Sequence, residues 1–204
     1  MRPLIVCTAL ALALASPARA QGAFSSSAWA GFGVGSARAD DARAGGAFGA
    51  LGIEVGRTAH PGHRVAVAFE AAGRVAGGRV ALDSGTGAPF RDASCAAFTF
   101  AYTRSPVRVR TVTPFVRLGV GGGTLAIGPT SWYDARMGVR VVRDRPESAA
   151  AVVGSAAVGI DLIARPGPLG AVLAVRWIGA RTRYSSLSAI VPSVGLVLRA
   201  LPPP

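Results

Sequence analysis

Apolar residues alternate with small or polar ones along most of the chain from residue 27 to residue 201. Val65, Val67 and Phe69, for example, fall on one face of an extended chain, and Glu70 falls on the other. Because successive strand side chains point to opposite faces, this alternation predicts β-strands with one apolar face. The 3.6-residue spacing typical of helices is almost absent. Eight strands are predicted, over Ser27–Ser36, Gly46–Arg57, Arg64–Gly77, Ser94–Arg104, Val112–Thr124, Ser148–Arg165, Leu169–Arg181 and Ala189–Leu201.

The connections between the predicted strands are alternately short and long. The short ones are Thr58–His63, Ser105–Thr111 and Pro166–Pro168. The longer ones are Ala37–Gly45, Gly78–Ala93, Leu125–Glu147 and the more modest Thr182–Ser188. An even number of strands, with tight turns at one end and longer loops at the other, is typical of transmembrane barrels. The sequence therefore predicts an all-β fold, an eight-stranded antiparallel up-and-down transmembrane β-barrel, with a secreted soluble β-sandwich as the alternative.

The N-terminal segment has a different pattern from the rest of the chain. A basic start precedes an apolar run over residues 4–15, Pro17 ends the run, and an Ala-x-Ala pattern closes at Ala20. The run is shorter than the roughly 20 residues that a membrane-spanning helix needs. Small residues at this spacing are typical of a secretory cleavage site. We therefore expect a signal peptide over residues 1–20 and a barrel domain over residues 21–204, with a short membrane anchor as the alternative.

Charged residues inside the predicted strands lie opposite the apolar row of their segment. This placement fits a barrel, because an arginine facing lipid at the membrane midplane costs about 2–4 kcal/mol. The interior of an eight-stranded barrel is only just wide enough to be filled by side chains, and buried charges persist only when paired. A solvated face of a soluble sheet is the alternative. The sequence predicts a lumenal charge network of Glu54, Glu70, Arg117, Asp161, Arg176 and Arg199.

The segments as a whole resemble the small eight-stranded outer-membrane barrels of the OmpA/OmpX and opacity-protein type. The resemblance covers nearly the whole mature chain and rests on stretches such as Thr113–Gly123, Ala157–Leu162, Leu173–Trp177 and Ser193–Arg199. It implies insertion into a Gram-negative-type outer membrane by the barrel-assembly machinery, with roles in adhesion, envelope integrity or occasionally a narrow pore.

The chain departs from this family in its aromatic residues. Such barrels often end on an aromatic residue, whereas here Leu198–Leu201 is followed by three prolines. Aromatic residues make up 7% of the chain, so the bands of aromatic side chains expected at the two membrane surfaces are thin. The candidates for these bands are Tyr102, Trp177 and Trp29.

Few residues are candidates for catalysis or metal binding. His60 and His63 flank a Pro-Gly turn without a neighbouring Cys, Asp or Glu, which favours a solvated turn over a metal site. The mature chain has no histidine outside that turn, so a serine hydrolase in the barrel wall is not expected. Cys95 is interpreted as a small apolar filler. We expect no enzyme activity, no cofactor and no bound metal.

Basic residues, all of them arginine, outnumber acidic ones by 22 to 10, and the formal net charge is +12. These arginines neither follow a helix face nor alternate with aromatic residues, so nucleic-acid binding is not expected. Four of them lie in the longest loop, where their planar guanidinium groups suit the phosphates of lipopolysaccharide. Solvated loop charge is the alternative. The four residues are Arg136, Arg140, Arg143 and Arg145.

The mean hydropathy of +0.42 excludes a disordered chain, and the alternation distributes the apolar residues over strands instead of one long segment. We therefore expect a monomeric outer-membrane protein, in contact with membrane lipid and lipopolysaccharide, with a structural or surface-interaction role in the cell envelope. A narrow pore and a secreted soluble binding module are the alternatives.

Overall fold

The computed structural model describes residues 24–39, 42–60, 62–82, 85–87, 93–106, 111–128, 130–134, 138–143, 147–163 and 168–199. Every regular element in these ranges is a strand, and none of the described residues form a helix long and apolar enough to span a membrane. The predicted signal peptide lies outside the described residues. The strands are β1 (Phe24–Ala39), β2 (Ala42–His60), β3 (His63–Leu82), β4 (Gly85–Gly87), β5 (Ala93–Arg104), β6 (Val112–Ile127), β7 (Thr130–Asp134), β8 (Val139–Arg143), β9 (Glu147–Ile163), β10 (Leu169–Arg181) and β11 (Ser185–Arg199).

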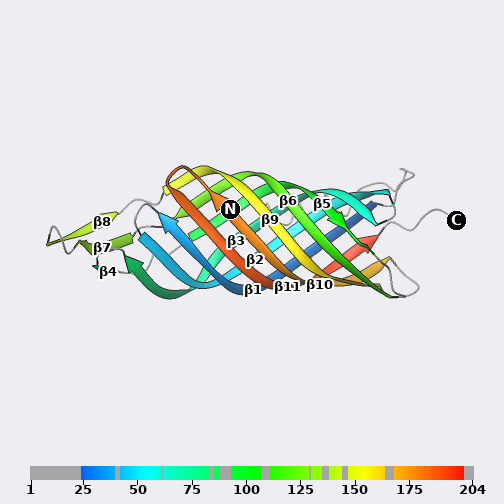
Figure 1. The fold of residues 1–204 in the computed structure, drawn as a ribbon, viewed down its shortest axis with the longest axis horizontal. Coiled ribbons are helices and arrows are strands. Elements are labelled where there is room, and N and C mark those ends of the chain that lie inside the picture. Colours follow the sequence, from blue (N-terminus) through cyan, green and yellow to red (C-terminus); the bar gives the residue numbers. More distant parts are fainter. Residues whose placement is uncertain are drawn as a thin grey trace, which may run out of the picture.

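Eight of these strands form a closed antiparallel barrel (Figure 1). In the order β1, β2, β3, β5, β6, β9, β10 and β11, each pairs with the next, and β11 pairs with β1 to close the ring. The closing pair runs from Ser25 opposite Arg199 to Ala39 opposite Ser185. The predicted up-and-down barrel is therefore confirmed, and the sandwich alternative is not. We call the end where β1 begins and β11 ends the terminal end, and the opposite one the loop end.

Three short strands extend the sheet beyond the barrel at the loop end (Figure 1). The far end of β3 pairs with β4, where Val80 lies opposite Gly87. Gly87 also pairs with Trp132 of β7, which in turn pairs with β8. The two long connections predicted over Gly78–Ala93 and Leu125–Glu147 thus contribute strands to one common extension.

Two of the predicted long connections are wrong. Strand β1 continues to Ala39 and β2 begins at Ala42, so the first connection is a tight hairpin. Strand β11 begins at Ser185, so the link after Arg181 is also short. The ends of these strands are rich in Gly, Ala and Ser and carry little apolar alternation, yet their backbones remain paired. Backbone pairing, which does not depend on side-chain polarity, extends the strands past the pattern.

The outside of the barrel is apolar. The predicted faces are confirmed, since Phe100 and Leu118 are 74% and 61% exposed while their chain neighbours point inward. Outward charged side chains in the described wall lie only near strand ends. Arg38 and Arg181 are at the loop end, and Arg57 and Arg104 are at the terminal end.

Two inward-facing glycines permit close contact between β5 and β6. A Cβ atom on Gly121 would lie 1.9 Å from the carbonyl oxygen of Phe98, and one on Gly123 would lie 2.1 Å from that of Ala96. Both distances are far below van der Waals contact, so only glycine fits. Glycine in a strand interior is typical of such close backbone approach and of strong local curvature.

Candidate functional site

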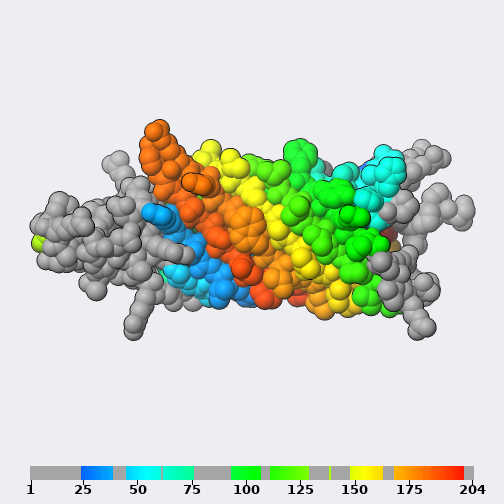
Figure 2. Space-filling view, in the orientation of Figure 1, coloured from blue at the N-terminus to red at the C-terminus, as the bar shows by residue number. Residues whose placement is uncertain are grey.

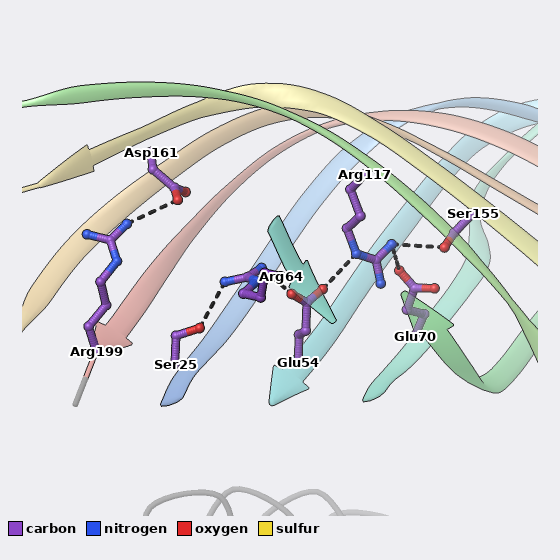
Figure 3. Close-up of polar contacts among 8 residues, drawn as sticks. All are labelled: Ser25, Glu54, Arg64, Glu70, Arg117, Ser155, Asp161 and Arg199. Atoms are coloured by element: carbon purple, nitrogen blue, oxygen red, sulfur yellow. Dashed lines mark hydrogen bonds and ion pairs between the residues drawn. The ribbon is translucent and has the colours of Figure 1, made fainter. Parts of the chain in front are cut away.

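The centre of the lumen holds a buried ionic cluster (Figure 3). Arg117 on β6 donates through Nε to Glu54 Oε2 on β2 at 2.6 Å. Its Nη1 lies 3.0 Å from Glu70 Oε1 on β3. All three side chains are at most 3% exposed. One guanidinium group therefore neutralises carboxylates from two strands that do not pair with β6. Three of the six predicted lumenal charges come together in this way.

Polar side chains from further strands complete the cluster. Arg117 Nη1 also donates to Ser155 Oγ on β9 at 2.9 Å, and Thr99 Oγ1 on β5 donates to Glu70 Oε2 at 3.0 Å. The cluster thus links β2, β3, β5, β6 and β9 across the lumen. These contacts meet most of the hydrogen-bonding capacity of the buried charges, which is what makes their burial tolerable. Among the described residues, the buried Nη2 of Arg117 has no hydrogen-bond partner.

Arg64 is a cluster member that the sequence analysis missed. Its guanidinium group forms an ion pair with Glu54 and donates to Ser25 Oγ on β1 at 3.1 Å. The signal was present in the sequence, because Arg64 lies six positions before Glu70 in the same alternating segment and therefore on the same face.

Arg176 lies in the lumen apart from these carboxylates. Its Nε donates to Ser193 Oγ at 3.0 Å, and its guanidinium carbon lies 4.2 Å from the ring centre of Trp29. Within the described ranges no carboxylate lies within ion-pair distance of Arg176. Stacking on an aromatic ring is a common way to accommodate an arginine cation.

This arrangement corrects the prediction that Trp29 belongs to an aromatic band at the membrane surface. Its side chain is 4% exposed and points into the lumen, so it does not belong to an aromatic band at the membrane surface. On β1 the outward face is the one that carries Phe32 and Val34, and Trp29 lies on the opposite face.

Asp161 and Arg199 form a separate pair near the terminal end. Arg199 donates to Asp161 Oδ2 at 3.1 Å, and the two side chains are 29% and 17% exposed. Figure 3 shows this pair set apart from the central cluster. The six predicted lumenal residues thus fall into a central group of three, one isolated pair and one stacked arginine.

Apolar side chains fill the lumen on both sides of the ionic cluster. Toward the loop end, Phe48, Leu125 and Ile178 are buried to 2% exposure or less. Toward the terminal end, Phe115 and Val197 belong to a second apolar cluster. The charged layer therefore lies between two apolar layers.

The remaining candidates lie outside the lumen network. Arg140 and Arg143 fall in β8, in the loop-end extension, and Arg136 and Arg145 lie outside the described residues. His60 pairs with His63 across the hairpin around Gly62, whose φ of 80° fits a glycine turn.

The His63 ring is hydrogen-bonded to the hydroxyl of Tyr102 at the terminal end. Cys95 is buried at the loop end of β5 with 4% exposure.

The sequence matches no protein-family model and no curated protein. The fold, however, has solved counterparts. The crystal structure of Neisserial surface protein A superposes with a TM-score of 0.57 at 11% identity, covering 87% of this chain and 98% of that protein. Ail of Yersinia pestis, in complex with the heparin analogue sucrose octasulfate, gives a TM-score of 0.46 at 13% identity and covers 88% and 100% of the two chains. The N-terminal β-barrel domain of Pseudomonas aeruginosa OprF gives 0.41 at 10% identity, covering 86% and 97%.

The likeness to Neisserial surface protein A shows the fold. The chain has the architecture of the small eight-stranded outer-membrane barrels.

Proposed function

We propose that the chain is an outer-membrane barrel with a sealed lumen, which acts as a structural or surface-interaction protein of the cell envelope. The loop end faces the outside and the terminal end faces the periplasm. The chain is a monomer that the barrel-assembly machinery inserts after cleavage of the signal peptide. The observation that carries the proposal is an apolar wall around a lumen with paired charges.

The wall supports a membrane location. Large apolar side chains such as Phe98, Phe100, Leu118 and Val194 are more than half exposed on the outside of the barrel. An apolar surface that encircles a protein would be unfavourable in water, and monomeric soluble proteins rarely expose patches of more than a few hundred Å². A closed barrel also leaves no sheet edge in the lipid, where unpaired backbone groups are costly.

The packing of the lumen favours a sealed barrel and argues against a pore. An ion that crossed it would have to pass Phe48 and Leu125, which are 0% and 2% exposed, and then the Glu54–Arg117–Glu70 cluster. An apolar constriction excludes water and therefore ions. The ionic cluster, for its part, joins strands that do not pair with one another, and every carboxylate oxygen of Glu54 and Glu70 already has a partner.

The loops are the parts that we expect to meet partners. They are Gly78–Ala93 and Leu125–Glu147, which contain the strands β4, β7 and β8 of the loop-end extension. This extension contains Arg140 and Arg143, and the same loop contains Arg136 and Arg145, which we propose contact lipopolysaccharide phosphates. Exposed loops on a rigid scaffold are the usual location of binding residues.

Membrane fractionation tests the location. The full chain, expressed in a Gram-negative host, is expected in the outer-membrane fraction. On detergent gels it is expected to migrate faster before heating than after, because a folded barrel resists detergent. Recovery of the folded protein in the soluble periplasmic fraction would contradict the proposal.

Planar-bilayer recording tests whether the barrel is sealed. Purified protein is expected to add no steady conductance to the bilayer. A reproducible unitary conductance would instead support the narrow-pore alternative, while leaving the membrane location untouched.

A further inference from the structure

The outer wall has a groove near the loop end. Its volume is about 790 Å³, and it lies where β9 and β10 meet the turn between β10 and β11. Its outward residues include Ala150, Gly154 and Gly179, where other parts of the wall carry larger side chains. Figure 2 shows the end of the β10–β11 hairpin, in orange, standing out from the wall beside the yellow strand β9. Small-molecule sites typically have volumes of roughly 300–1,000 Å³, so the groove is large enough for part of a lipid.

Trp177 forms one side of this groove. A Cβ atom on Gly179 would lie 2.4 Å from Trp177 Cζ2, and one on Gly154 would lie 3.3 Å from Cζ3, so the indole ring lies across both glycines. The ring is held by a hydrogen bond of 2.9 Å from its Nε1 to Ser188 Oγ. The groove therefore has an aromatic side in a fixed position, and the two glycines are the residues that allow it.

Two arginines stand at the rim of the groove. Arg181 and Arg183 are exposed, and in the part of the chain that the structure describes neither has an ion-pair partner. They flank Thr182, whose Oγ1 accepts hydrogen bonds from the backbone nitrogens of Tyr184 at 3.2 Å and Ser185 at 2.9 Å. The turn is thus fixed by its own hydrogen bonds. The guanidinium carbon of Arg183 lies 5.2 Å from the ring centre of Tyr184, and this contact leaves its N–H donors, like those of Arg181, available to an external anion.

The arginines lie at the height of lipid headgroups. The outward side chains of β10 are apolar from Leu169 to Trp177, and Gly179 and Arg181 follow. With a rise of about 3.3 Å per residue and a tilt of about 40°, Arg181 lies roughly 30 Å along the barrel axis from Leu169. The apolar band of such barrels is about 25 Å tall. The groove therefore lies within the outer part of the lipid layer, and its cations lie just beyond.

We propose that this groove binds an acyl chain of lipopolysaccharide and that Arg181 and Arg183 contact a phosphate of its lipid A. The apolar lining suits the chain, and guanidinium groups bind phosphate through charge-assisted hydrogen bonds. Lipopolysaccharide is chosen over phospholipid because the inference rests on the proposed orientation, in which the loop end faces outward and the groove opens to the outer leaflet. The site is separate from the arginines of the longest loop.

Native mass spectrometry of the detergent-solubilised barrel tests this site. The protein is titrated with bisphosphorylated lipid A, with the same lipid after removal of its phosphates, and with phosphatidylglycerol. Bisphosphorylated lipid A is expected to bind about tenfold more tightly than either of the others. The variant R181S/R183S is expected to lose this preference, because it removes the cations and leaves the groove. The variant A150L is expected to weaken binding of both lipid A forms, because leucine fills the groove and leaves the cations.

The matched control is R57S/R104S, which removes two exposed outward arginines at the terminal end. It is expected to bind lipid A as the unaltered barrel does. Equal loss in R57S/R104S and R181S/R183S would show an effect of net charge alone and would overturn the site. Equal binding of phosphatidylglycerol would overturn the choice of lipid.

Heat-modifiable migration is recorded for every variant, so that a failure to fold is seen separately. A barrel that folds and fractionates with the outer membrane but has no lipid A preference would overturn this inference alone. A chain found in the soluble fraction would overturn the proposed function with it.

Discussion

Arg117 and Glu54 lie 63 positions apart in the sequence, and their side chains meet inside the barrel with Nε and Oε2 2.6 Å apart. Strand β6 carries the arginine and β2 the glutamate, so this contact joins strands that do not pair with each other. It exists only because the sheet closes on itself. The contact therefore depends on closure of the barrel, and its removal should lower the stability of the whole barrel.

Replacing Arg117 is expected to destabilise the barrel strongly. The variant R117M leaves Glu70 buried without a cation, and loss of one partner of a buried ion pair costs about 3–5 kcal/mol. Glu54 is less affected, since it keeps its ion pair with Arg64. The free energy of unfolding, measured by urea titration in lipid vesicles with tryptophan fluorescence, checks the loss. The double variant R117M/E70Q should recover part of it, because the unpaired charge is removed; no recovery would mean that charge burial is not the cause.

The pair of Asp161 and Arg199 provides a contrast within the same lumen. These side chains are 17% and 29% exposed, and partly solvated pairs contribute about 0–1 kcal/mol. The variant R199M should therefore change the unfolding free energy much less than R117M does, in the same titration. Equal losses in the two variants would show that depth in the lumen does not set the strength of its ion pairs.

Gly121 should not tolerate a side chain. Its Cβ would lie 1.9 Å from a backbone oxygen of the neighbouring strand, so G121A must push β5 and β6 apart. Overpacking of this kind costs about 1–3 kcal/mol. At the adjacent Gly122 the nearest atom to a Cβ is 4.0 Å away, so G122A should be neutral or slightly stabilising. Urea titration and the fraction of heat-modifiable protein distinguish the two, and equal tolerance would contradict the close approach of the strands.

The sequence was sufficient to predict the eight strands of the barrel wall and the faces of their central residues. The period-two pattern places Glu70 inward and Phe69 outward from local information alone, because the alternation of strand side chains needs no partner strand. The same rule places Arg64 on the inward face that also carries Glu70. It places Trp29 on the inward face of its strand and Phe32 on the outward face. Both placements follow from the local alternation alone.

Contacts across the lumen could not be predicted in this way. Which carboxylate Arg117 meets depends on the stagger between β2 and β6, and this stagger accumulates over the strands between them. The hollow beside Trp177 likewise depends on three strands being in register. The strands of the loop-end extension were missed because short strands such as Gly85–Gly87 carry no alternation.

The cost of an arginine on the lipid-facing wall should depend on its depth in the membrane. Val175 lies near the middle of the apolar row of β10, and Leu169 lies at its terminal end. An arginine at the midplane costs about 2–4 kcal/mol, whereas one near the membrane surface costs about 0–1 kcal/mol. The variant V175R should therefore lose several times more unfolding free energy than L169R in vesicles. A soluble barrel would show no such dependence, since both positions would face water.

Cys95 offers a chemical test of the inward and outward faces at the loop end of β5. Its side chain is 4% exposed inside the barrel, and its neighbour Ser94 is exposed on the outside. In a chain expressed from Gln21, a water-soluble maleimide should leave Cys95 unmodified in the folded barrel and label it after denaturation, because a buried thiol reacts only when the structure opens. The variant S94C/C95S moves the thiol by one residue and should be labelled without denaturation. Mass spectrometry of the two proteins measures the labelled fraction, and equal labelling of both would mean that residues 94 and 95 do not face opposite sides of the barrel wall.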